Sequence, residues 1–457
     1  MKLLIIKSNW LFESDLRLDG KFHLSDGRLA RKKISNSPYP IKSIGEVTKD
    51  IFYGGRDRRI YVKDPKKGIL FMGSADMLKS SFDTLKYISK RHTKNLDSYL
   101  LGTGWTLVSR SGTIGNTVFT NEDYRDKAAS EHIIRILPGT DILPGVLYSY
   151  LSSKYGYALL TQGTFGAVIQ HIEPEFLAEL PIPILPDALQ QVVHNLMMVA
   201  AKLRVESNEI IASLLQKINT HLKDELGNLK KVNISSRSIN DIVRFDKRFD
   251  APYNISMGRR IHDKFTSGKY VTLASLSEVF HPMLFGKKQL KGSVSRGNPL
   301  YKSSSMMKMK PETDFWLSLN KTESYAKLKV KEGWVLISRT GTVGNVVRIT
   351  KSMNDVFIDD HMIRVKPKEK FSGLIYIFLK SFYGHKLIDF QKYGSVQEVI
   401  NSDYIERIPI PQKLLADNIL TEFNDNVRDS AAKIDKAIDY ENEAIVLIEK
   451  EIESWQK

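Results

Sequence analysis

The chain has 457 residues, of which 42% are hydrophobic and 10% aromatic, so it is long enough for two or more domains with cores of their own. It contains no cysteine, which excludes disulfide frameworks, zinc knuckles, iron–sulfur clusters and cysteine nucleophiles. Its formal net charge is +16 at pH 7, which fits a polyanionic partner. Only four apolar residues lie between Lys2 and Lys7, and no later run suggests a spanning helix, so we expect a soluble, cytoplasmic protein.

Short blocks near the start of the chain return in its second half. Arg17, Asp19 and Phe22 form a pattern that recurs as Arg248, Asp250 and Tyr253. The runs 44–47 and 276–279 also resemble each other, and both are predicted to be short strands that end at a following glycine. Between these blocks the two halves diverge, in stretches rich in Lys and Arg at 54–68, 286–297 and 302–310.

The longest repeat is GWTLVSRSGTIGNTV, residues 104–118, which returns as GWVLISRTGTVGNVV, residues 333–347, with 10 of 15 positions identical. Its alternating apolar residues predict a strand, its glycines a tight reversal, and its last residues a returning strand. Such a turn can also bind phosphate through backbone amides, but the Walker lysine is missing, so a structural hairpin is favoured. Arg110 and Arg339 lie in this repeat, and either bracing the turn or reaching a phosphate would suit them.

A further strand is predicted in each half, over SEHIIRILP and DDHMIRVKP, where His132 matches His361 and Arg135 matches Arg364. The acid–histidine pairs allow acid–base chemistry, but the alternation favours a strand. Helices are predicted over 144–160 and 372–388. Proline pairs then predict an extended exit strand in each half, at Pro181 and Pro183 and at Pro409 and Pro411.

A long helix follows each exit strand, because apolar residues recur there at spacings of four and three without a proline. The second run covers 36 residues, about 54 Å of helix. Polar Ser207, Ser430 and Glu441 interrupt the pattern, and Asp187 is a candidate cap for the first helix. The apolar residues that we assign to helix pairing and partner docking are Leu189, Val193, Leu196, Leu203, Ile210, Phe423, Val427, Ile434, Ile438, Ile445 and Ile448.

The predicted fold is therefore α+β: two globular mixed α/β domains, related by a pseudo-twofold axis and separated by two long antiparallel coiled-coil helices. The domains are 1–186, here called the first head, and 231–411, the second head; the helices are 187–230 and 412–457. The heads carry net charges of +7 and +14, and the helices 0 and −5. Because the positive charge is confined to the heads, the heads are the expected site of polyanion binding.

The doubled order of basic head, proline-rich exit and long helix resembles the DNA-specificity subunit of type I restriction-modification enzymes. The resemblance covers essentially the whole chain and implies that each head is a target recognition domain for one half of a bipartite, asymmetric DNA site. It implies that the helices space the heads and dock methyltransferase subunits, two copies being expected, with nuclease or translocase subunits as further partners. No cofactor is then expected in this chain, while S-adenosylmethionine, ATP and Mg belong to the partners. The second exit has Leu414 and Asn418 where the first has Pro186 and Gln190, which leaves equal docking of two partners open.

The residues that read DNA are expected where the heads differ, because heads that read different half-sites share a scaffold and vary in their loops. For any one of them, a solvated side chain or a phosphate contact is a commoner role than base reading. The candidates, with the two arginines of the repeat, are Arg56, Arg58, Arg59, Lys79, Arg110, Gln162, Lys287, Lys288, Lys291, Arg296, Lys302, Lys308 and Arg339.

Two other functions stay open from the sequence. The first is a self-contained nuclease, for which Asp64-Pro65-Lys66 is a weak signature fragment without suitably placed further acids. The second is a duplicated coiled-coil scaffold whose basic heads bind a partner other than DNA. No amino-methyltransferase motif and no Walker sequence occurs in the chain, so we predict no catalytic residues and no metal site.

Overall fold

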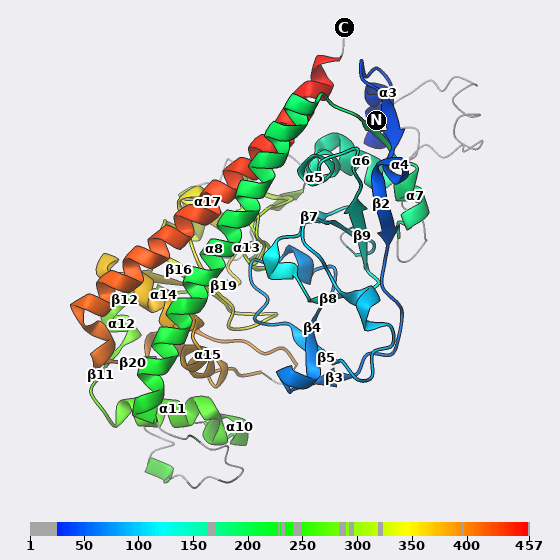
Figure 1. The fold of residues 1–457 in the computed structure, drawn as a ribbon. Helices are drawn as coiled ribbons and strands as arrows, with labels where there is room; N and C mark the ends of the chain where they lie inside the picture. Colours follow the sequence, from blue (N-terminus) through cyan, green and yellow to red (C-terminus); the bar gives the residue numbers. More distant parts are fainter. Residues whose placement is uncertain are drawn as a thin grey trace. The chain divides into compact units, whose positions relative to one another are not determined.

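The structure is a computed structural model that describes residues 25–226, 248–282, 289–291, 297–318 and 323–455 except 113, 163–170 and 395, with a few isolated positions between 229 and 240. Its chain divides into two compact units, one of residues 1–205 and 436–457 and one of residues 206–435. Each unit therefore contains one head and a part of each long helix (Figure 1). Among the helices of the described residues, none has the length and apolarity that a membrane crossing needs.

The first head is built on a four-stranded antiparallel sheet with the order β2-β9-β6-β7, here called its framework sheet. Thr106–Ser109 of β6 pair with β9 on one side and with β7 on the other, and all four of these residues are buried. The hairpin predicted in the long repeat is thus confirmed, with Gly112 and Gly115 at positive φ in its turn. The strands are β2 (Thr48–Phe52), β6 (Thr106–Ser109), β7 (Thr117–Phe119) and β9 (Ile133–Pro138).

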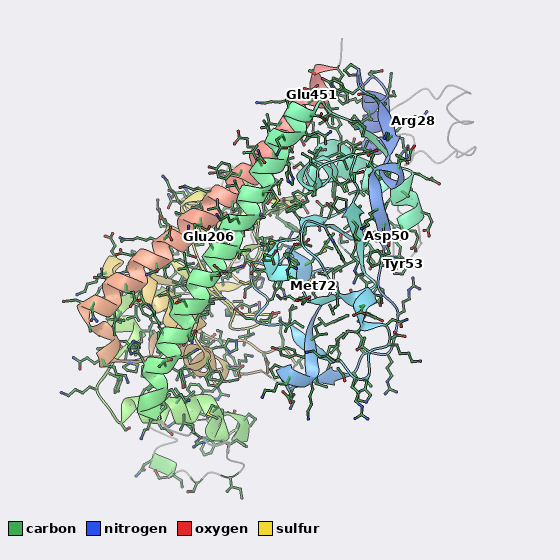
Figure 2. The ribbon with its side chains drawn as sticks, in the orientation of Figure 1. Arg28, Asp50, Tyr53, Met72, Glu206 and Glu451 are labelled. Carbon is green, nitrogen blue, oxygen red and sulfur yellow. The ribbon has the colours of Figure 1, made fainter. Side chains whose placement is uncertain are left out.

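A second sheet of the first head has the order β3-β5-β4-β8, with β4 and β8 parallel. Its strand β3 and the first residue of β4 belong to the stretch 54–68, for which the sequence showed no counterpart. Met72, at the end of β4, is fully buried and anchors this sheet (Figure 2). The strands are β3 (Tyr61–Val62), β4 (Gly68–Met72), β5 (Lys86–Ser89) and β8 (Ala128–Ala129).

Helices and a short two-stranded sheet complete the first head. The prediction of a helix over 144–160 is confirmed as two helices that break at Ser153, and the proline exit strand is confirmed as β10, which pairs with β1. Two prolines fit in β10 because β1 is its one neighbour in this two-stranded sheet. The elements are α3 (Asp26–Ile34), β1 (Ile41–Ser43), α4 (Ile44–Val47), α5 (Pro144–Ser152), α6 (Lys154–Gln162), α7 (Pro174–Ala178) and β10 (Pro181–Pro183).

The second head repeats this plan. Its framework sheet has the order β12-β19-β16-β17, and its second sheet the order β13-β15-β14-β18, again with one parallel pair, β14 with β18. The divergent basic stretches therefore contribute to sheets of the same plan in the two heads, with β3 in the first and β13 in the second. The elements are α10 (Ala251–Ile255), α11 (Met257–Thr266), β11 (Tyr270–Thr272), α12 (Leu273–Leu276), β12 (Ser277–Phe280), β13 (Gln289–Lys291), β14 (Gly297–Tyr301), α13 (Ser303–Met306), β15 (Phe315–Ser318), β16 (Val335–Ser338), β17 (Val346–Arg348), β18 (Phe357–Ile358), β19 (Met362–Pro367), α14 (Ser372–Lys380), α15 (Phe382–Asp389), α16 (Ser402–Glu406) and β20 (Pro409–Pro411).

The strand predicted at residues 44–47 is wrong, because this run is the helical turn α4. Ser43 caps the turn by accepting a hydrogen bond from the Glu46 N–H, and the Glu46 carboxylate accepts one in return from the Ser43 N–H. This reciprocal capping box stabilises a turn of helix over a strand. The structural counterpart of α4 is α12, residues 273–276, at an offset of 229 residues. The sequence comparison that matched 44–47 with 276–279 was therefore displaced by three residues from the structural equivalence.

Both long helices are confirmed, as α8 (Asp187–Leu226) and α17 (Asp417–Ser454). In the second unit they run antiparallel, since Ser207 lies opposite Ser430 and Lys217 forms an ion pair with Glu422. The buried residues of α8 are not the predicted ones throughout: Met197 and Arg204 are buried, while Leu196 and Leu203 are only partly so. Glu441 and Ser430 of α17 are buried too. Polar residues that were expected to interrupt the pairing are thus part of it.

The first residues of the two long helices correct the expectation about caps. Asp187 is the first residue of α8, so its carboxylate lies in the first turn instead of before it. Asp417 has the same place in α17, although no equivalent residue was recognised there. An acid in the first turn is stabilised by the helix dipole, so both helices begin with the same favourable charge.

The Arg–Asp–aromatic block is structural where it is described. Asp250 caps α10 by accepting a hydrogen bond from the Tyr253 N–H, and Arg248 forms an ion pair with Asp250 and stacks on Tyr253, with its guanidinium carbon 4.3 Å from the ring centre. The first copy of the block, at Arg17, Asp19 and Phe22, lies outside the described residues.

Candidate nucleic-acid interface

Each framework sheet is held to its second sheet by a fully buried arginine. Arg135 donates hydrogen bonds to the carbonyl oxygens of Tyr99, Ala129, Ser130 and Ile133. Burial lowers the pKa of Arg135 to about 10, so the side chain remains charged at neutral pH. A charge in this position is tolerated because the four carbonyl dipoles replace its solvation.

Arg364 repeats this arrangement in the second head. Its guanidinium donates to the carbonyl oxygens of Ile358, Asp359 and Met362, and burial lowers its pKa to about 10 as well. The sequence matched the two arginines but gave them no role. The structure shows that they belong to the shared scaffold and do not reach the surface.

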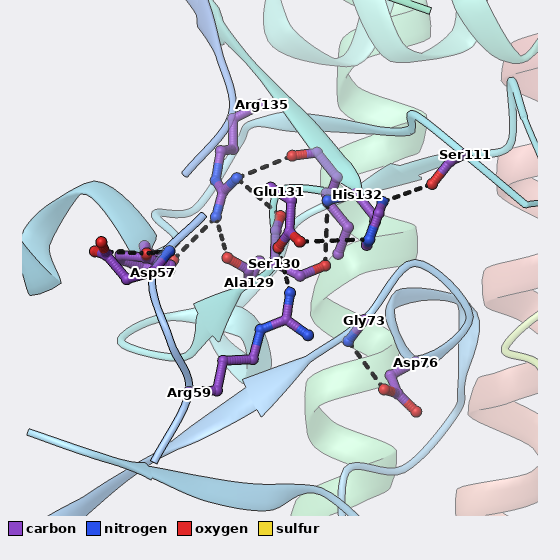
Figure 3. Close-up of polar contacts among 12 residues, drawn as sticks. Asp57, Arg59, Gly73, Asp76, Ser111, Ala129, Ser130, Glu131, His132 and Arg135 are labelled. Carbon is purple, nitrogen blue, oxygen red and sulfur yellow. Dashed lines mark hydrogen bonds and ion pairs between the residues drawn. The ribbon is translucent and has the colours of Figure 1, made fainter. Parts of the chain in front are cut away.

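The two matching histidines lie just before β9 and β19, beside the hairpin turns. Nδ1 of His132 is 2.7 Å from Oγ of Ser111, and Nδ1 of His361 is 3.1 Å from Oγ1 of Thr340. In the first head Nε2 of His132 is also 3.4 Å from a carboxylate oxygen of Glu131. Figure 3 shows this chain of contacts continuing from Glu131 to Arg59. Within the described residues, no group of three or more His, Asp or Glu side chains is arranged to hold a metal ion.

The arginine-rich loop of the first head presents three guanidinium groups in different environments. Arg59 forms an ion pair with Glu131 (Figure 3). Its guanidinium carbon also lies 4.9 Å from the ring centre of Phe71. Arg56 lies over the ring of Tyr53, while Arg58 is exposed and forms no interaction within the described part of the chain. The loop therefore combines one preorganised cation with one that is free to bind.

Exposed basic residues continue from this loop across the second sheet. Backbone hydrogen bonds connect the segments that carry these residues. The Lys90 N–H donates to the Lys67 carbonyl, and the Ser89 N–H donates to the Ile60 carbonyl. The exposed lysines and arginines that the sequence interpretation did not name are Lys63, Lys66, Lys67, Lys86, Lys90, Arg91 and Lys94. The charge run KRHTK at 90–94 was the signal that could have found three of them. Together with Arg56, Arg58 and Arg59 they form what we call the first basic surface.

The remaining candidates of the first head lie elsewhere. Lys79 is partly buried and forms an ion pair with Asp76 at 2.7 Å. Gln162 is the last residue of α6, where its side-chain oxygen accepts a hydrogen bond from Nε of Arg31 at 3.3 Å. Both side chains have protein partners, and their role in DNA reading remains a prediction.

The candidates of the second head are only partly described. Lys287, Lys288 and Arg296 lie outside the described residues, and Lys291 lies on β13 without a described side chain. Lys302 follows β14 and stacks its ammonium 3.4 Å from the ring centre of Phe315, and Lys308 is partly buried. Of these candidates, Lys291 lies on the second sheet of this head and Lys302 directly follows one of its strands.

Arg110 and Arg339 occupy the same backbone position after β6 and β16. The N–H of each donates to the carbonyl of the matching histidine, at 2.9 Å from Arg110 and 2.8 Å from Arg339. Arg110 is buried and forms an ion pair with Glu173, and it stacks on Tyr53 at 4.7 Å, which supports a bracing role for this residue. Arg339 is partly exposed.

The first part of α8 has an outer apolar face as well as a buried one. Val192, Met198 and Val199 are 50%, 47% and 43% exposed. Val193 is buried in the core of the first head, and Leu189 and Leu196 pack against that core while partly exposed. In the second unit, Phe423 and Val427 are buried in the core and Ile210 packs against it. Of the other helix candidates, Ile448 is buried, while Leu203, Ile434, Ile438 and Ile445 are partly exposed.

Comparison with known proteins gives a family for part of the chain. Residues 270–415 match the family described as "Type I restriction modification DNA specificity domain". A search of curated proteins finds no match. Among solved structures, the S subunit of a type I restriction-modification system from M. genitalium is 15% identical, covering 92% of this chain and 96% of its own, with a TM-score of 0.34. The HsdS subunit from Thermoanaerobacter tengcongensis is 13% identical, covering 91% of this chain and 96% of its own, with a TM-score of 0.27.

The matched segment runs from β11 to the end of η10 (Gln412–Leu415), so it contains the framework sheet, the hairpin and the proline exit strand of the second head. The same elements recur in the same order in the first head. Residues 270–415 are therefore similar to the DNA specificity domain of type I restriction-modification systems.

Proposed function

We propose that the chain recognises a bipartite, asymmetric DNA site, with each head reading one half-site. The observation that carries this proposal is the contrast within each head, where a shared framework sheet supports a second sheet of unlike, basic sequence. A shared framework gives both heads the same way of approaching DNA, while unlike sheets give them different base contacts. Because the second sheets of the two heads differ in sequence, the two heads would recognise two different half-sites.

The first basic surface would bind the DNA backbone and place reading side chains in the major groove. Exposed lysines without buried partners suit phosphate contacts, which supply affinity that falls with salt. Arg58 is our principal candidate for base reading in the first head, because its guanidinium is exposed and forms no interaction within the described residues. Guanine O6 and N7 match the two donors of a guanidinium.

The chain would contribute recognition, and partner subunits the chemistry. The exposed apolar face around Val192, Met198 and Val199 is the proposed contact for a methyltransferase subunit, with two copies in the complete assembly. Restriction or translocase subunits are further proposed partners. S-adenosylmethionine, ATP and Mg would be bound by those subunits, and this chain would have no catalytic residue of its own.

Methylation with and without the chain tests this function. DNA of a host that expresses the chain with its methyltransferase partner should carry one modified bipartite motif, and that motif should disappear when the chain is deleted. Replacing the second head alone should change one half of the motif and leave the other half intact. An unchanged methylome after deletion would contradict the proposal, and so would a motif without two separable halves.

A further inference from the structure

The hairpin arginine that the two repeats share has different surroundings in the two heads. In the first, Arg110 is only 4% exposed, and its guanidinium donates to both carboxylate oxygens of Glu173, with Nε 3.3 Å from one of them. Glu173 is the residue just before α7. The positive charge of Arg110 is thus neutralised within the head.

The equivalent of Glu173 in the second head is identified by the backbone. The Ile172 N–H donates to the Arg110 carbonyl at 3.2 Å, and the Ile400 N–H donates to the Arg339 carbonyl at 3.3 Å. The next residue is Glu173 in the first head and Asn401 in the second, and each precedes an equivalent short helix, α7 or α16. An uncharged amide therefore replaces the carboxylate.

The side-chain oxygen of Asn401 already accepts a hydrogen bond, from the Tyr393 hydroxyl at 2.7 Å. The stacking aromatic differs as well. Phe52 pairs with Arg135 and Phe280 with Arg364, so the residue after each is equivalent: Tyr53 in the first head and His281 in the second. The Tyr53 ring lies 4.7 Å from the guanidinium carbon of Arg110, whereas the His281 ring is hydrogen bonded to the Asp360 carbonyl at 2.6 Å.

Arg339 is left with an uncompensated charge at the tip of its hairpin. Within the described residues its side chain forms no ion pair, hydrogen bond or ring contact, and its buried Nε has no acceptor. The side chain is partly exposed, and Gly341 and Thr342 beside it are exposed. The adjacent Thr340 hydroxyl, hydrogen bonded to His361, is a further polar group at this tip. A partly exposed cation without a protein partner is available to bind an external anion.

We infer that Arg339 forms a backbone-phosphate site in the second head that the first head does not have, because Glu173 occupies the guanidinium there and Asn401 does not. This inference rests on the proposed DNA-binding function. The two heads would then differ in electrostatics as well as in base reading, and the second head would hold the DNA backbone with one more contact at its hairpin.

The test is the salt dependence of binding by the full-length chain to a fluorescent duplex of random sequence. Each phosphate contact contributes about 0.9 to the slope of log affinity against log salt. Arg339→Gln should lower the slope by about 0.9 and weaken binding about fivefold at physiological salt. Asn401→Glu should have the same effect although it leaves the arginine in place, because it supplies the carboxylate that neutralises Arg110 in the first head.

Two variants serve as controls. Arg339→Lys keeps the charge and should keep the wild-type slope, and Arg110→Gln should also keep it, because Arg110 is already paired. The inference is overturned if Arg339→Gln retains the wild-type slope, or if Arg110→Gln lowers the slope as much. Should Arg339→Gln fail to fold, Asn401→Glu decides alone, and a wild-type slope for this variant overturns the inference. Absence of DNA binding by the wild-type chain would overturn the proposed function itself.

Discussion

The two units have the same framework but bury different polar residues in it. Where the helices pair, the first unit buries a charged group, Arg204 with Glu441 and the Tyr148 hydroxyl, whereas the second buries two neutral hydroxyls, Ser207 and Ser430. Where the head meets the long helix, a backbone N–H donates to His194 in the first unit and to Asn424 in the second. The two units therefore share their strand order more closely than their buried polar side chains. Each of these side-chain differences should give one unit a response to mutation or pH that the other unit lacks.

The largest expected effect is at the buried charge pair. Glu441→Leu should lower the free energy of unfolding by about 3–5 kcal/mol, because it leaves Arg204 buried without a counter-charge. The double variant Arg204→Met with Glu441→Leu should recover most of that loss, since it also removes the desolvation cost. Urea unfolding followed by circular dichroism measures both.

The second unit provides the matched control for that experiment. Ser207→Ala with Ser430→Ala removes both hydroxyls together and should change stability by less than about 1 kcal/mol. If this double variant were as destabilised as Glu441→Leu, the contrast between a charged and a neutral pairing site would be wrong.

The buried arginines should behave alike in the two units, which tests what is shared. Arg135→Met and Arg364→Met each leave several buried carbonyl oxygens without a donor and should cost about 2–4 kcal/mol. Hydrogen exchange should show the loss of protection in the unit that carries the substitution. Arg125→Met, which removes an exposed ion pair with Glu122 and an exposed hydrogen bond to Thr103, should cost less than about 1 kcal/mol. Equal effects of Arg125→Met and Arg135→Met would contradict the scaffold role.

The contact between head and long helix depends on a glycine in each unit. A Cβ at Gly373 would lie 2.6 Å from the Phe423 carbonyl oxygen, and a Cβ at Gly145 would lie 2.8 Å from Cα of His194. Each glycine-to-alanine change should therefore cost about 1–3 kcal/mol, because backbone atoms would have to move. At Gly73 the nearest atom would be 3.5 Å away, so Gly73→Ala is the control and should be within about 0.5 kcal/mol of wild type. Thermal unfolding compares the three.

The smallest expected effect is a pH dependence of stability that arises at the contact between head and long helix in the first unit only. Nδ1 of His194 accepts a hydrogen bond from the Gly145 N–H at 3.2 Å, and burial lowers the pKa of His194. Because the folded protein then binds this proton less readily than the unfolded chain, stability is fully present above the unfolded pKa of about 6.5 and is lost as pH falls below it.

The equivalent acceptor, Asn424, does not titrate, which supplies the comparison. His194→Asn should make the first contact resemble the second, and the stability of the variant should fall less than that of wild type between neutral and mildly acidic pH. Unfolding measured at a series of pH values shows the difference. Identical pH profiles for wild type and variant would rule out a contribution from His194, since His281 and His385 also have lowered pKa values and remain in both proteins.

The sequence by itself determined the duplication, the strand–turn–strand hairpins, the proline exit strands and the two long helices. These features depend on local signals, such as glycine at positive φ and apolar spacing, which act within a few residues of the chain. It also located Arg59 and its neighbours as exposed basic residues. The family resemblance followed from the order of these blocks and is supported by the match of residues 270–415.

Only the tertiary structure decided which polar residues are neutralised. Arg110 and Glu173 are 63 positions apart, and Arg204 and Glu441 are 237 apart, so no local pattern joins them. The equivalence of the two second sheets was hidden as well, because strand pairing is set by backbone hydrogen bonds that unlike side chains can share. The distinction between Arg110 and Arg339, which occupy the same position in the repeat, arises from a carboxylate that folding brings to Arg110 and not to Arg339.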